Sequence, residues 1–373
     1  MEPESPIDMN ENIDSLSAEK RMIGYLEKIA TGPKMSKDLT EEEAEDGLNL
    51  ILNGEVSAVR SALFLIAARM KRETLEENLG FWRALDQTTL RYETKLDRLL
   101  QMADAFDGFQ RVPYFGFFVL PVLAELGLPA YGHSSLPQPP KFGITFEDLL
   151  VNHYGVPGDL SLDKRAALIE KYGFGYLSTR QTHPKLDALN DLRREIVKRP
   201  MLATFEKLLR PLKAKQTFLA TNYFHPGYEQ AMLHALQHSE FDRVLIGNGM
   251  EGTTLYGVHK TAKMVIHNQG KGVEEMTFSH ESLYDKPTAQ QIAEAFRTLK
   301  ETTLTRETLA ELGEQALENG TGPAAPLIAH HAGSLLHLLE IIPESQKAFH
   351  SAWNVLKEGN SLKLFQDFIK ECA

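Results

Sequence analysis

The sequence predicts an α/β protein in which a small all-helical subdomain packs on a larger α/β domain with a central mixed or parallel sheet. Three observations predict this class. The first hundred residues carry helical apolar spacing between capping residues. The apolar run 112–128 separates two glycine-containing turns, which is typical of strand, turn, buried helix and strand around a ligand crevice. Short apolar runs then alternate with helical segments.

Composition narrows the class of protein. A chain of 373 residues can bury one large core, and 42% hydrophobic with 24% charged residues is ordinary for a globular protein. The net charge of −11 argues against a protein that coats DNA generally, although a local basic groove is compatible with it. The single cysteine, Cys372, excludes an internal disulfide and disfavours a cysteine-based metal site.

The sequence supports neither a membrane span nor a secretion signal. No apolar run reaches 18 residues, and the amino terminus has neither the basic nor the apolar region of a secretion signal. We therefore expect a cytoplasmic protein with no membrane contact. Residues 1–21 are acidic and weakly apolar, which predicts a disordered or loosely docked arm.

Residues 22–92 are predicted to form a helical subdomain. Thr40 and Glu43 fit a capping box at the start of its second helix, and Ser57 and Thr74 fit the N-caps of the third and fourth. The apolar faces expected for these three helices are Ala44, Leu48, Ile51 and Leu52, then Val59, Leu63, Ile66 and Ala67, then Leu75, Leu79, Trp82 and Leu85.

Residues 93–342 are predicted to form the α/β domain. Its expected strands include 218–220, 244–246 and 264–266, with a helix over 228–236 between the first two. A buried helix is expected from Leu327 to Ile342, ended by Pro343. Residues 343–373 are predicted to add one or two amphipathic helices as a carboxyl-terminal appendage.

Several segments carry a resemblance to a known family. Residues 39–44, 51–57, 62–71 and 73–77 resemble the amino-terminal helical domain of anthranilate phosphoribosyltransferase and its nucleoside phosphorylase relatives. Segments 171–176, 183–184, 192–195 and 199–204 keep that family's order, so the resemblance spans roughly 22–339. It implies the glycosyltransferase family 3 fold, shared with type II nucleoside phosphorylases. It also implies that helices near 183–212 complete the helical subdomain, a homodimer through that subdomain, and an active cleft between the two parts.

The donor-binding motifs of that family are degenerate here. The family's Gly-Thr-Gly-Gly-Asp-Gly turn aligns with residues 103–108, of which only Asp107 and Gly108 match, while Asp104 and Phe106 oppose a phosphate by charge and bulk. Its Lys-His-Gly-Asn segment aligns with 130–133 and loses the lysine. Its magnesium-binding Asp-Glu pair falls near Thr254 and Leu255, where Glu251 supplies at most one nearby carboxylate.

The resemblance thus assigns no catalytic residue. Magnesium is expected only if transferase chemistry remains, and no other cofactor or metal is predicted. His330 and His331 point to different faces of one helix, which disfavours a metal site there.

A basic stretch suggests what else the chain binds. Between 193 and 215 it carries Arg193, Arg194, Lys198, Arg199, Lys207, Arg210, Lys213 and Lys215. Such a cluster is a candidate site for nucleic acid or a phosphorylated metabolite, and equally the solvated outer faces of helices. Arg193 aligns with the arginine that holds the aromatic acid's carboxylate in the family, and a helix-end arginine paired with a nearby acid fits as well.

The candidate cleft and anion-binding residues are Asp107, Gly108, Gly132, His133, Ser134, Lys141, Arg193, Arg194, Lys198 and Arg199. Lys141 follows two prolines that fix its approach, and it is a candidate replacement for the missing lysine. His133 has no nucleophile and orienting partner beside it in the sequence. The aromatic residues between 106 and 118 fit a core, or alternatively a surface that stacks bases.

Three functions remain open at this point. A diverged, noncatalytic sister group that binds nucleic acid predicts salt-sensitive binding that weakens when Arg194, Lys198 and Arg199 become alanine. A glycosyl or phosphoribosyl transferase of altered specificity predicts binding of a phosphoribosyl donor that depends on Asp107. A dimeric scaffold or regulatory protein predicts neither behaviour.

Overall fold

The computed structural model describes residues 16–32 and 34–372, so residues 1–15 of the arm expected at 1–21 lie outside the described range. The first helix, α1 (Ala18–Ile29), begins earlier than expected, because Ser17 caps it by accepting a hydrogen bond from the amide of Lys20. Residues 18–21, which the sequence assigned to the arm, are therefore the first turn of the helical subdomain.

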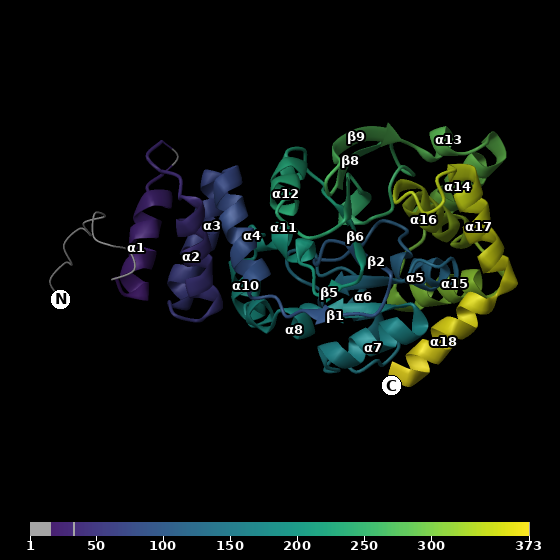
Figure 1. Ribbon diagram of the computed structural model, residues 1–373, viewed down its shortest axis with the longest axis horizontal. Helices are drawn as coiled ribbons and strands as arrows, with labels where there is room; N and C mark the ends of the chain where they lie inside the picture. Colours follow the sequence, from purple (N-terminus) through teal and green to yellow (C-terminus); the bar gives the residue numbers. More distant parts are fainter. Residues whose placement is uncertain (1–15, 33, 373) are drawn as a thin grey trace.

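The helical subdomain lies at one end of the molecule (Figure 1). Its helices are α1, α2 (Glu41–Leu52), α3 (Ala58–Lys71) and α4 (Leu75–Gln87). Three short helices from later in the chain, α9 (Pro184–Asp187), α10 (Asn190–Ile196) and α11 (Leu202–Phe205), belong to the same part, with α10 against α3 and α11 against α4. Segments more than a hundred residues apart in the sequence thus share one core.

The predicted caps of these helices are confirmed. Thr40 with Glu43 and Thr74 with Glu77 form capping boxes, and Ser57 accepts a hydrogen bond from the amide of Arg60. Each cap satisfies amides that have no partner inside the helix, so the chain fixes its helix starts locally.

The expected buried face of α3 was wrong. Val59 and Leu63 are 69% and 53% exposed, whereas Phe64, Leu65 and Ala68 are buried in the core. The helix has two apolar faces, and periodicity alone does not say which of them meets the rest of the chain. The outer face, which also carries Met70, is left uncovered.

The α/β domain is built on a seven-stranded sheet in the order β4-β3-β2-β6-β7-β8-β9. The first five of these strands in that order are parallel, and β8 and β9 are antiparallel to their neighbours, which confirms the mixed sheet. Its strands are β2 (Arg98–Ala103), β3 (Ala130–Ser134), β4 (Phe174–Ser178), β6 (Gln216–Asn222), β7 (Arg243–Gly247), β8 (Ala262–Asn268) and β9 (Gly272–Phe278). A small parallel ribbon pairs β1 (Tyr92–Glu93) with β5 (Leu212–Lys213).

Alternate residues of the strands face two cores. Leu100, Met102 and Phe218 join the larger core with the carboxyl-terminal helices, and Leu219 and Val244 join the core of the helical subdomain. The helices of this domain are α5 (Gly116–Glu125), α6 (Phe146–Asn152), α7 (Leu162–Tyr172), α8 (Thr179–Thr182), α12 (Tyr228–Leu236), α13 (His280–Leu283), α14 (Lys286–Lys300), α15 (Arg306–Asn319) and α16 (Ala325–Leu338). Short 3₁₀ turns occupy Glu206–Leu208 and Met250–Gly252.

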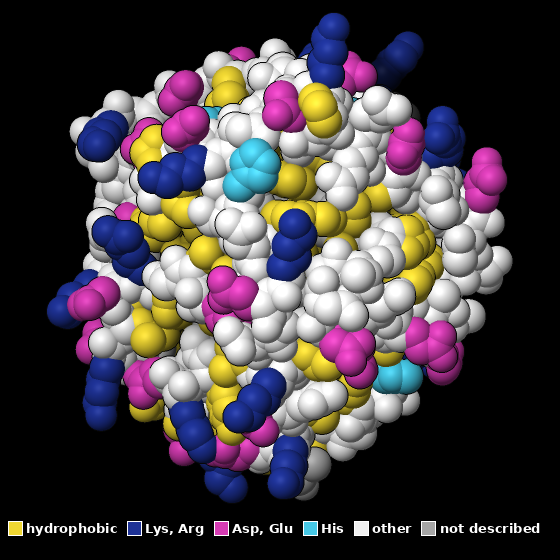
Figure 2. All heavy atoms as spheres, turned by 90° about the vertical axis from the view of Figure 1, so that its right-hand side faces the viewer, with side chains coloured by type: hydrophobic (Ala, Val, Ile, Leu, Met, Phe, Trp, Pro, Cys, Tyr) yellow, Lys and Arg dark blue, Asp and Glu magenta, His cyan; other side chains and the backbone are white. Residues whose placement is uncertain are grey.

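Two helices, α17 (Ser345–Glu358) and α18 (Asn360–Cys372), follow at the edge opposite the helical subdomain (Figure 1). The buried helix α16 ends at Leu338, earlier than the expected Ile342, and Pro343 lies beyond its end. Figure 2 shows the face formed by these carboxyl-terminal helices, on which side chains of both charges are interspersed. Across the described residues, no helix is long and apolar enough to cross a membrane.

Candidate functional site

The main cavity, of about 320 Å³, lies between the helical subdomain and the carboxyl ends of the parallel strands. Its walls come from the loops after β2, β3, β6 and β7 on one side and from α3, α4 and the segment 193–207 on the other. Parallel strands bring their following loops to one edge of the sheet, which is why segments distant in sequence meet here. This is the cleft that the sequence predicted between the two parts.

We call the main chain of residues 104–112 and the side chain of Glu251 the floor of the cavity. Several floor amides have acceptors within the protein. The amide of Ala105 donates to the carbonyl of Gly252 at 2.9 Å, that of Gly108 to the carbonyl of Ala105 at 2.9 Å, and that of Phe109 to the carbonyl of Ile144 at 3.1 Å. Gly108 has φ +75°, and a Cβ there would lie 2.4 Å from Gly143, so glycine is required. The turn that corresponds to the family's phosphate-binding loop thus spends these donors on its own chain.

The carboxylate of Glu251 closes the far end of the floor. Its Oε2 accepts hydrogen bonds from the amides of Gln110, Arg111 and Val112 at 3.2, 2.6 and 2.9 Å. Burial alone would raise the pKa of Glu251, but these three hydrogen bonds hold it below its usual range. A single side chain therefore occupies three consecutive amide donors.

Asp107 is buried beside two cations. Its carboxylate forms an ion pair with the guanidinium of Arg199, and the Nζ of Lys141 lies 3.3 Å from its other oxygen. Lys141 also donates to the main-chain carbonyl of Glu251 at 2.9 Å, and burial lowers its pKa to about 8. Asp107, Lys141 and Arg199, predicted separately, are thus brought together in one charge-compensated cluster.

Lys207 and Asp104 are two further charged residues near this cluster whose pKa values are shifted. Burial lowers the pKa of Lys207 to about 7, and its Nζ donates to the carbonyl and the side-chain oxygen of Asn222. Burial raises the pKa of Asp104 to about 6, and its carboxyl accepts from Tyr114 at 2.5 Å and from the amide of Thr254 at 2.8 Å. Lys207 was part of the basic stretch but was not singled out, because a run of charges gives no sign of which member turns inward.

Arg193 lines the cavity but is already paired. Its guanidinium donates two hydrogen bonds to the carboxylate of Glu206, at 2.6 and 3.0 Å, and both side chains are buried. This bidentate pair uses the guanidinium group of Arg193 that was expected to hold a ligand's carboxylate. The alternative that the sequence left open, an arginine paired with a neighbouring acid, is the one found.

The exposed edge of the cavity differs from its floor. We call the side chains of Arg69, Arg111, Phe224, His225 and Tyr228 the rim; all five line the cavity. The Arg111 side chain is 79% exposed, and Phe224 and Tyr228 are exposed large hydrophobic residues. The ring of His225 lies 4.9 Å from that of Phe224 and 6.4 Å from that of Tyr228, so the rim combines aromatic faces with cations.

Gly132, His133 and Ser134 lie in β3 and do not line the main cavity. His133 is fully buried between Gln101 and Thr182, and burial lowers its pKa to about 3. A Cβ at Gly132 would lie 2.1 Å from the ring of Phe146, so this glycine allows close packing. These positions serve the interior of the domain.

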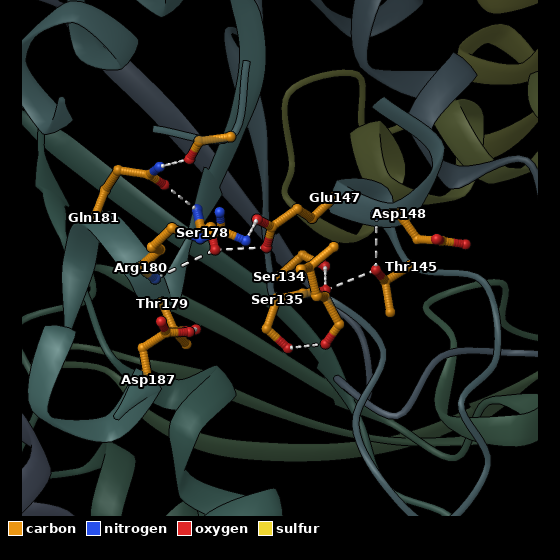
Figure 3. Close-up of polar contacts among 12 residues, drawn as sticks. Ser134, Ser135, Thr145, Glu147, Asp148, Ser178, Thr179, Arg180, Gln181 and Asp187 are labelled. Atoms are coloured by element: carbon orange, nitrogen blue, oxygen red, sulfur yellow. Dashed lines mark hydrogen bonds and ion pairs between the residues drawn. The ribbon is translucent and has the colours of Figure 1, made fainter. Parts of the chain in front are cut away.

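Figure 3 shows the polar contacts at the carboxyl end of β3. Ser134 donates to the carbonyl of Ser135 at 3.3 Å, and Thr145 donates to the same carbonyl at 2.7 Å. Beside them the buried Glu147 accepts from Ser178 at 2.5 Å and from Arg180 at 3.1 Å. This network ties α6 to the end of β4, and it is satisfied by the protein itself.

The basic stretch does not form one continuous surface. Arg194 and Lys198 are exposed and lie outside the cavity, and Arg194 pairs with Asp191 at 3.1 Å. Further along, Arg210 pairs with Glu240, Lys213 with Glu93 at 3.0 Å and Lys215 with Asp97 at 2.6 Å. Of the basic stretch, Arg193, Arg199 and Lys207 line the cavity, as does the separately predicted Lys141.

The residues at the cavity do not fit a magnesium site. Magnesium requires free oxygen ligands, and the carboxylates of Asp104, Asp107 and Glu251 are held by hydrogen-bond donors or cations of the protein. Thr254, at the place of the family's carboxylate pair, is buried. Among residues 16–32 and 34–372, no group of three or more His, Cys, Asp or Glu side chains is arranged to hold a metal.

Comparison with known proteins places the fold. Residues 23–89 match the model of the glycosyl transferase family, helical bundle domain. An uncharacterized protein of Aquifex aeolicus is 29% identical over 216 residues, which span 58% of this chain and 64% of that protein. An anthranilate phosphoribosyltransferase of Methanopyrus kandleri is 25% identical over 352 residues, 93% of this chain and 99% of that protein.

Solved structures share the whole architecture. Anthranilate phosphoribosyltransferase from Thermus thermophilus superposes with a TM-score of 0.70 at 22% identity, covering 96% of this chain and 99% of that one. The enzyme from Saccharomyces cerevisiae in complex with PRPP and Mg gives a TM-score of 0.73 at 14% identity, covering 94% and 97%. At these identities the superpositions establish the fold, and the sequence matches add the relationship. Together, the matching helical-bundle model, the sequence relatives and the solved structures support an anthranilate phosphoribosyltransferase-like family, with the glycosyltransferase family 3 fold, for this chain.

Proposed function

We propose that this protein binds the phosphate and base of a nucleotide unit at the cavity between its two parts, and that it does not transfer phosphoribosyl groups. The observation that carries the proposal is the contrast within one cavity. Six amides of its floor, those of Ala105 and of residues 108–112, donate to internal acceptors, whereas its rim presents cations beside exposed aromatic rings.

The rim supplies the chemistry that a nucleotide needs. Aromatic faces such as those of Phe224 and Tyr228 stack on bases without regard to sequence, and guanidinium groups such as those of Arg69 and Arg111 attract phosphate. The unit recognised belongs either to a free nucleotide or to a single strand of nucleic acid. The cavity volume of about 320 Å³ falls within the range of small-molecule sites.

The floor opposes phosphoribosyl transfer. A pyrophosphate requires free amides at the turn after β2, and here the amides of Ala105, Gly108 and Phe109 donate to main-chain carbonyls. The buried ring of Phe106 packs edge-on against His133 with ring centroids 5.4 Å apart, which occupies space in the same turn. The alternative of a transferase with altered specificity requires this turn to rearrange.

Fluorescence anisotropy tests the proposal directly. A labelled single-stranded oligonucleotide, competed by unlabelled AMP or by inorganic phosphate, separates a strand from a free nucleotide and from simple anion binding. We expect binding to weaken as salt rises, and Arg111→Ala to weaken it and to lower the salt slope by about one. The control is Arg194→Ala, which removes an exposed arginine outside the cavity. Equal losses in both variants, or no binding of either nucleotide form, would contradict the proposal.

We also propose that two copies of the chain associate through the outer face of α3. Val59, Leu63, Ile66 and Met70 follow one another at helical spacing, and Val59, Leu63 and Met70 are 69%, 53% and 74% exposed. Such a stripe on one surface helix is a recognised mark of an interface, and a second copy presents the same stripe to it. The resemblance to a family that dimerises through its helical subdomain supports a second copy of the chain as the partner of this face.

Light scattering on the intact protein tests this association. We expect a dimer for the natural sequence and a monomer for Leu63→Glu, because a charge on the apolar stripe is costly to bury. The control Lys363→Glu places the same charge on α18, at the other end of the molecule. A monomer for the natural sequence, or a dimer that survives Leu63→Glu, would contradict the association.

A further inference from the structure

Glu251 stands in a position that a bound anion would take. Its carboxylate receives three consecutive main-chain amides, from Gln110, Arg111 and Val112, at distances of 2.6 to 3.2 Å. Successive amides that converge on one point form a concave anion site, and charge-assisted hydrogen bonds to them are among the strong ones. Both Arg111 and Glu251 line the main cavity, so this point is part of the cleft wall.

The main chain of Glu251 is held in a conformation that a non-glycine residue rarely adopts. Its φ is +54°, and the next residue, Gly252, has φ +82°. The carbonyl of Gly252 accepts the amide of Ala105, and the carbonyl of Glu251 accepts Lys141. A left-handed residue costs free energy, of order 1 kcal/mol, which the contacts of the carboxylate offset.

The carboxylate of Glu251 has a second partner, the side chain of Arg111. The Nε of Arg111 is 3.4 Å from Oε1 of Glu251, and the Arg111 side chain is 79% exposed. If Glu251 leaves the amides, it can keep this arginine as its partner at the surface. The three amides would then be left without an acceptor, which is costly for buried donors unless another anion replaces the carboxylate.

We propose that the amides of residues 110–112 form an anion site which the chain's own Glu251 keeps occupied, and that an anionic group of a ligand binds there by displacing this side chain. The occupant class is a carboxylate or a phosphate, as the three donors and Glu251 itself indicate. Displacement of Glu251 would regulate binding in the cavity described above. This proposal rests on the proposed function only for the identity of the natural ligand. It makes Glu251 an internal competitor that lowers the affinity of the cavity for phosphate.

Chemical rescue tests this site without knowledge of the natural ligand. In Glu251→Gly, where glycine also suits the positive φ, we expect sodium formate to raise the melting temperature by several degrees more than sodium chloride does at equal ionic strength. The natural sequence should respond equally to both salts. Titration calorimetry with inorganic phosphate should show binding at least about ten times tighter in Glu251→Gly than in the natural protein, about 1.4 kcal/mol.

Two further variants keep the test decisive. Glu251→Gln retains a neutral acceptor for the amides, and its phosphate affinity should also rise. It replaces the glycine variant in the test if Glu251→Gly fails to fold. Asp191→Asn removes one carboxylate outside the cavity and should change neither measurement. The inference is overturned if folded Glu251 variants gain no phosphate affinity, or if formate and chloride stabilise Glu251→Gly equally.

Failure of this inference is distinguishable from failure of the proposed function. A natural protein that binds the oligonucleotide, with Glu251 variants that gain no phosphate affinity, would contradict the internal competitor alone. Glu251 variants that gain phosphate affinity, with no nucleotide binding by the natural protein, would contradict the proposed ligand alone.

Discussion

The floor and the rim of the same cavity differ in how their polar groups are satisfied. On the floor, the amides of residues 110–112 meet Glu251, and Asp107 meets Arg199 and Lys141. On the rim, Arg111 is largely exposed and the rings of Phe224 and Tyr228 face solvent. A polar group that already has a partner gains little from a ligand. The rim arginines have internal contacts as well, Arg111 with Glu251 and Arg69 with the carbonyl of Arg199, but the exposed Arg111 side chain and the aromatic rings remain accessible. We therefore propose the rim as the place where new molecules bind.

The contrast also shows how a fold can keep its cleft and change its chemistry. The position of the cavity follows from the parallel strands, which bring the same loops together whatever those loops contain. The reactivity follows from a few side chains on those loops. Here Asp104, Phe106 and Glu251 are such side chains, and we propose that they leave no room for a donor's phosphates.

The largest effect on stability is expected when the buried ion pair between Arg193 and Glu206 is broken. Glu206→Gln removes the charge that compensates the buried Arg193, and an uncompensated buried charge should cost about 3–5 kcal/mol in the free energy of unfolding. Urea unfolding measures this loss. Asp191→Asn breaks the exposed pair with Arg194 and should cost no more than about 1 kcal/mol. Similar losses in the two variants would remove the distinction between the closed interior and the open surface.

The next largest effect should appear at the rim. Phe224→Ala removes an exposed ring beside the cavity, and its loss should weaken binding of a single-stranded oligonucleotide by about 1–3 kcal/mol, the range for one stacked base. Anisotropy titrations measure the change. Val273→Ala removes an exposed apolar side chain from β9 and is the control, since Val273 lies outside the cavity. An unchanged affinity for Phe224→Ala would show that the rim does not stack bases.

A smaller effect separates the interior of β3 from the rim. Burial lowers the pKa of His133 from 6.5 to about 3, so the unfolded chain takes up a proton at this residue before the folded one does. The resulting stability is complete above about pH 6.5 and is lost as the pH falls toward 3. At pH 5 this histidine should account for about 2 kcal/mol of the loss, which His133→Gln should remove.

Unfolding curves at pH 7 and pH 5 for both proteins give that difference. Oligonucleotide affinity provides the complementary measurement, because His133 lies outside the main cavity and His133→Gln should leave the affinity unchanged. A loss of affinity in a stably folded His133→Gln protein would return this histidine to the binding site.

The helical subdomain was predictable because its signals are local. Thr40 and Glu43 act within one turn of helix, and the structure contains the capping box that their spacing indicates. The strands β6, β7 and β8 and the helix α12 (Tyr228–Leu236) were predictable for a similar reason, since each is a short apolar run or a periodic segment. The buried face of α3 was not predictable, because the helix has two apolar faces and only contacts with distant parts of the chain decide which one is buried.

The site was predictable only in part, because its pairs join distant residues. Glu251 and Arg111 are 140 positions apart, and no local pattern indicates that the carboxylate of one meets the amide of the other. Asp107 and Arg199 were each singled out, yet their ion pair across 92 positions was not. The charge run at 193–215 indicated cations correctly and could not show that Glu206, Glu240, Glu93 and Asp97 would compensate them.

The most direct test of the closed floor is a calorimetric titration of the natural protein with phosphoribosyl pyrophosphate and magnesium. Since the amides of Ala105 and residues 108–112 and the carboxylates of Asp107 and Glu251 already have partners, we predict no saturable binding in the micromolar range and no turnover with an aromatic amine acceptor. The same protein should bind a single-stranded oligonucleotide at low salt. Micromolar, magnesium-dependent binding of the donor, lost in Asp107→Ala, would contradict the closed floor and establish the transferase alternative.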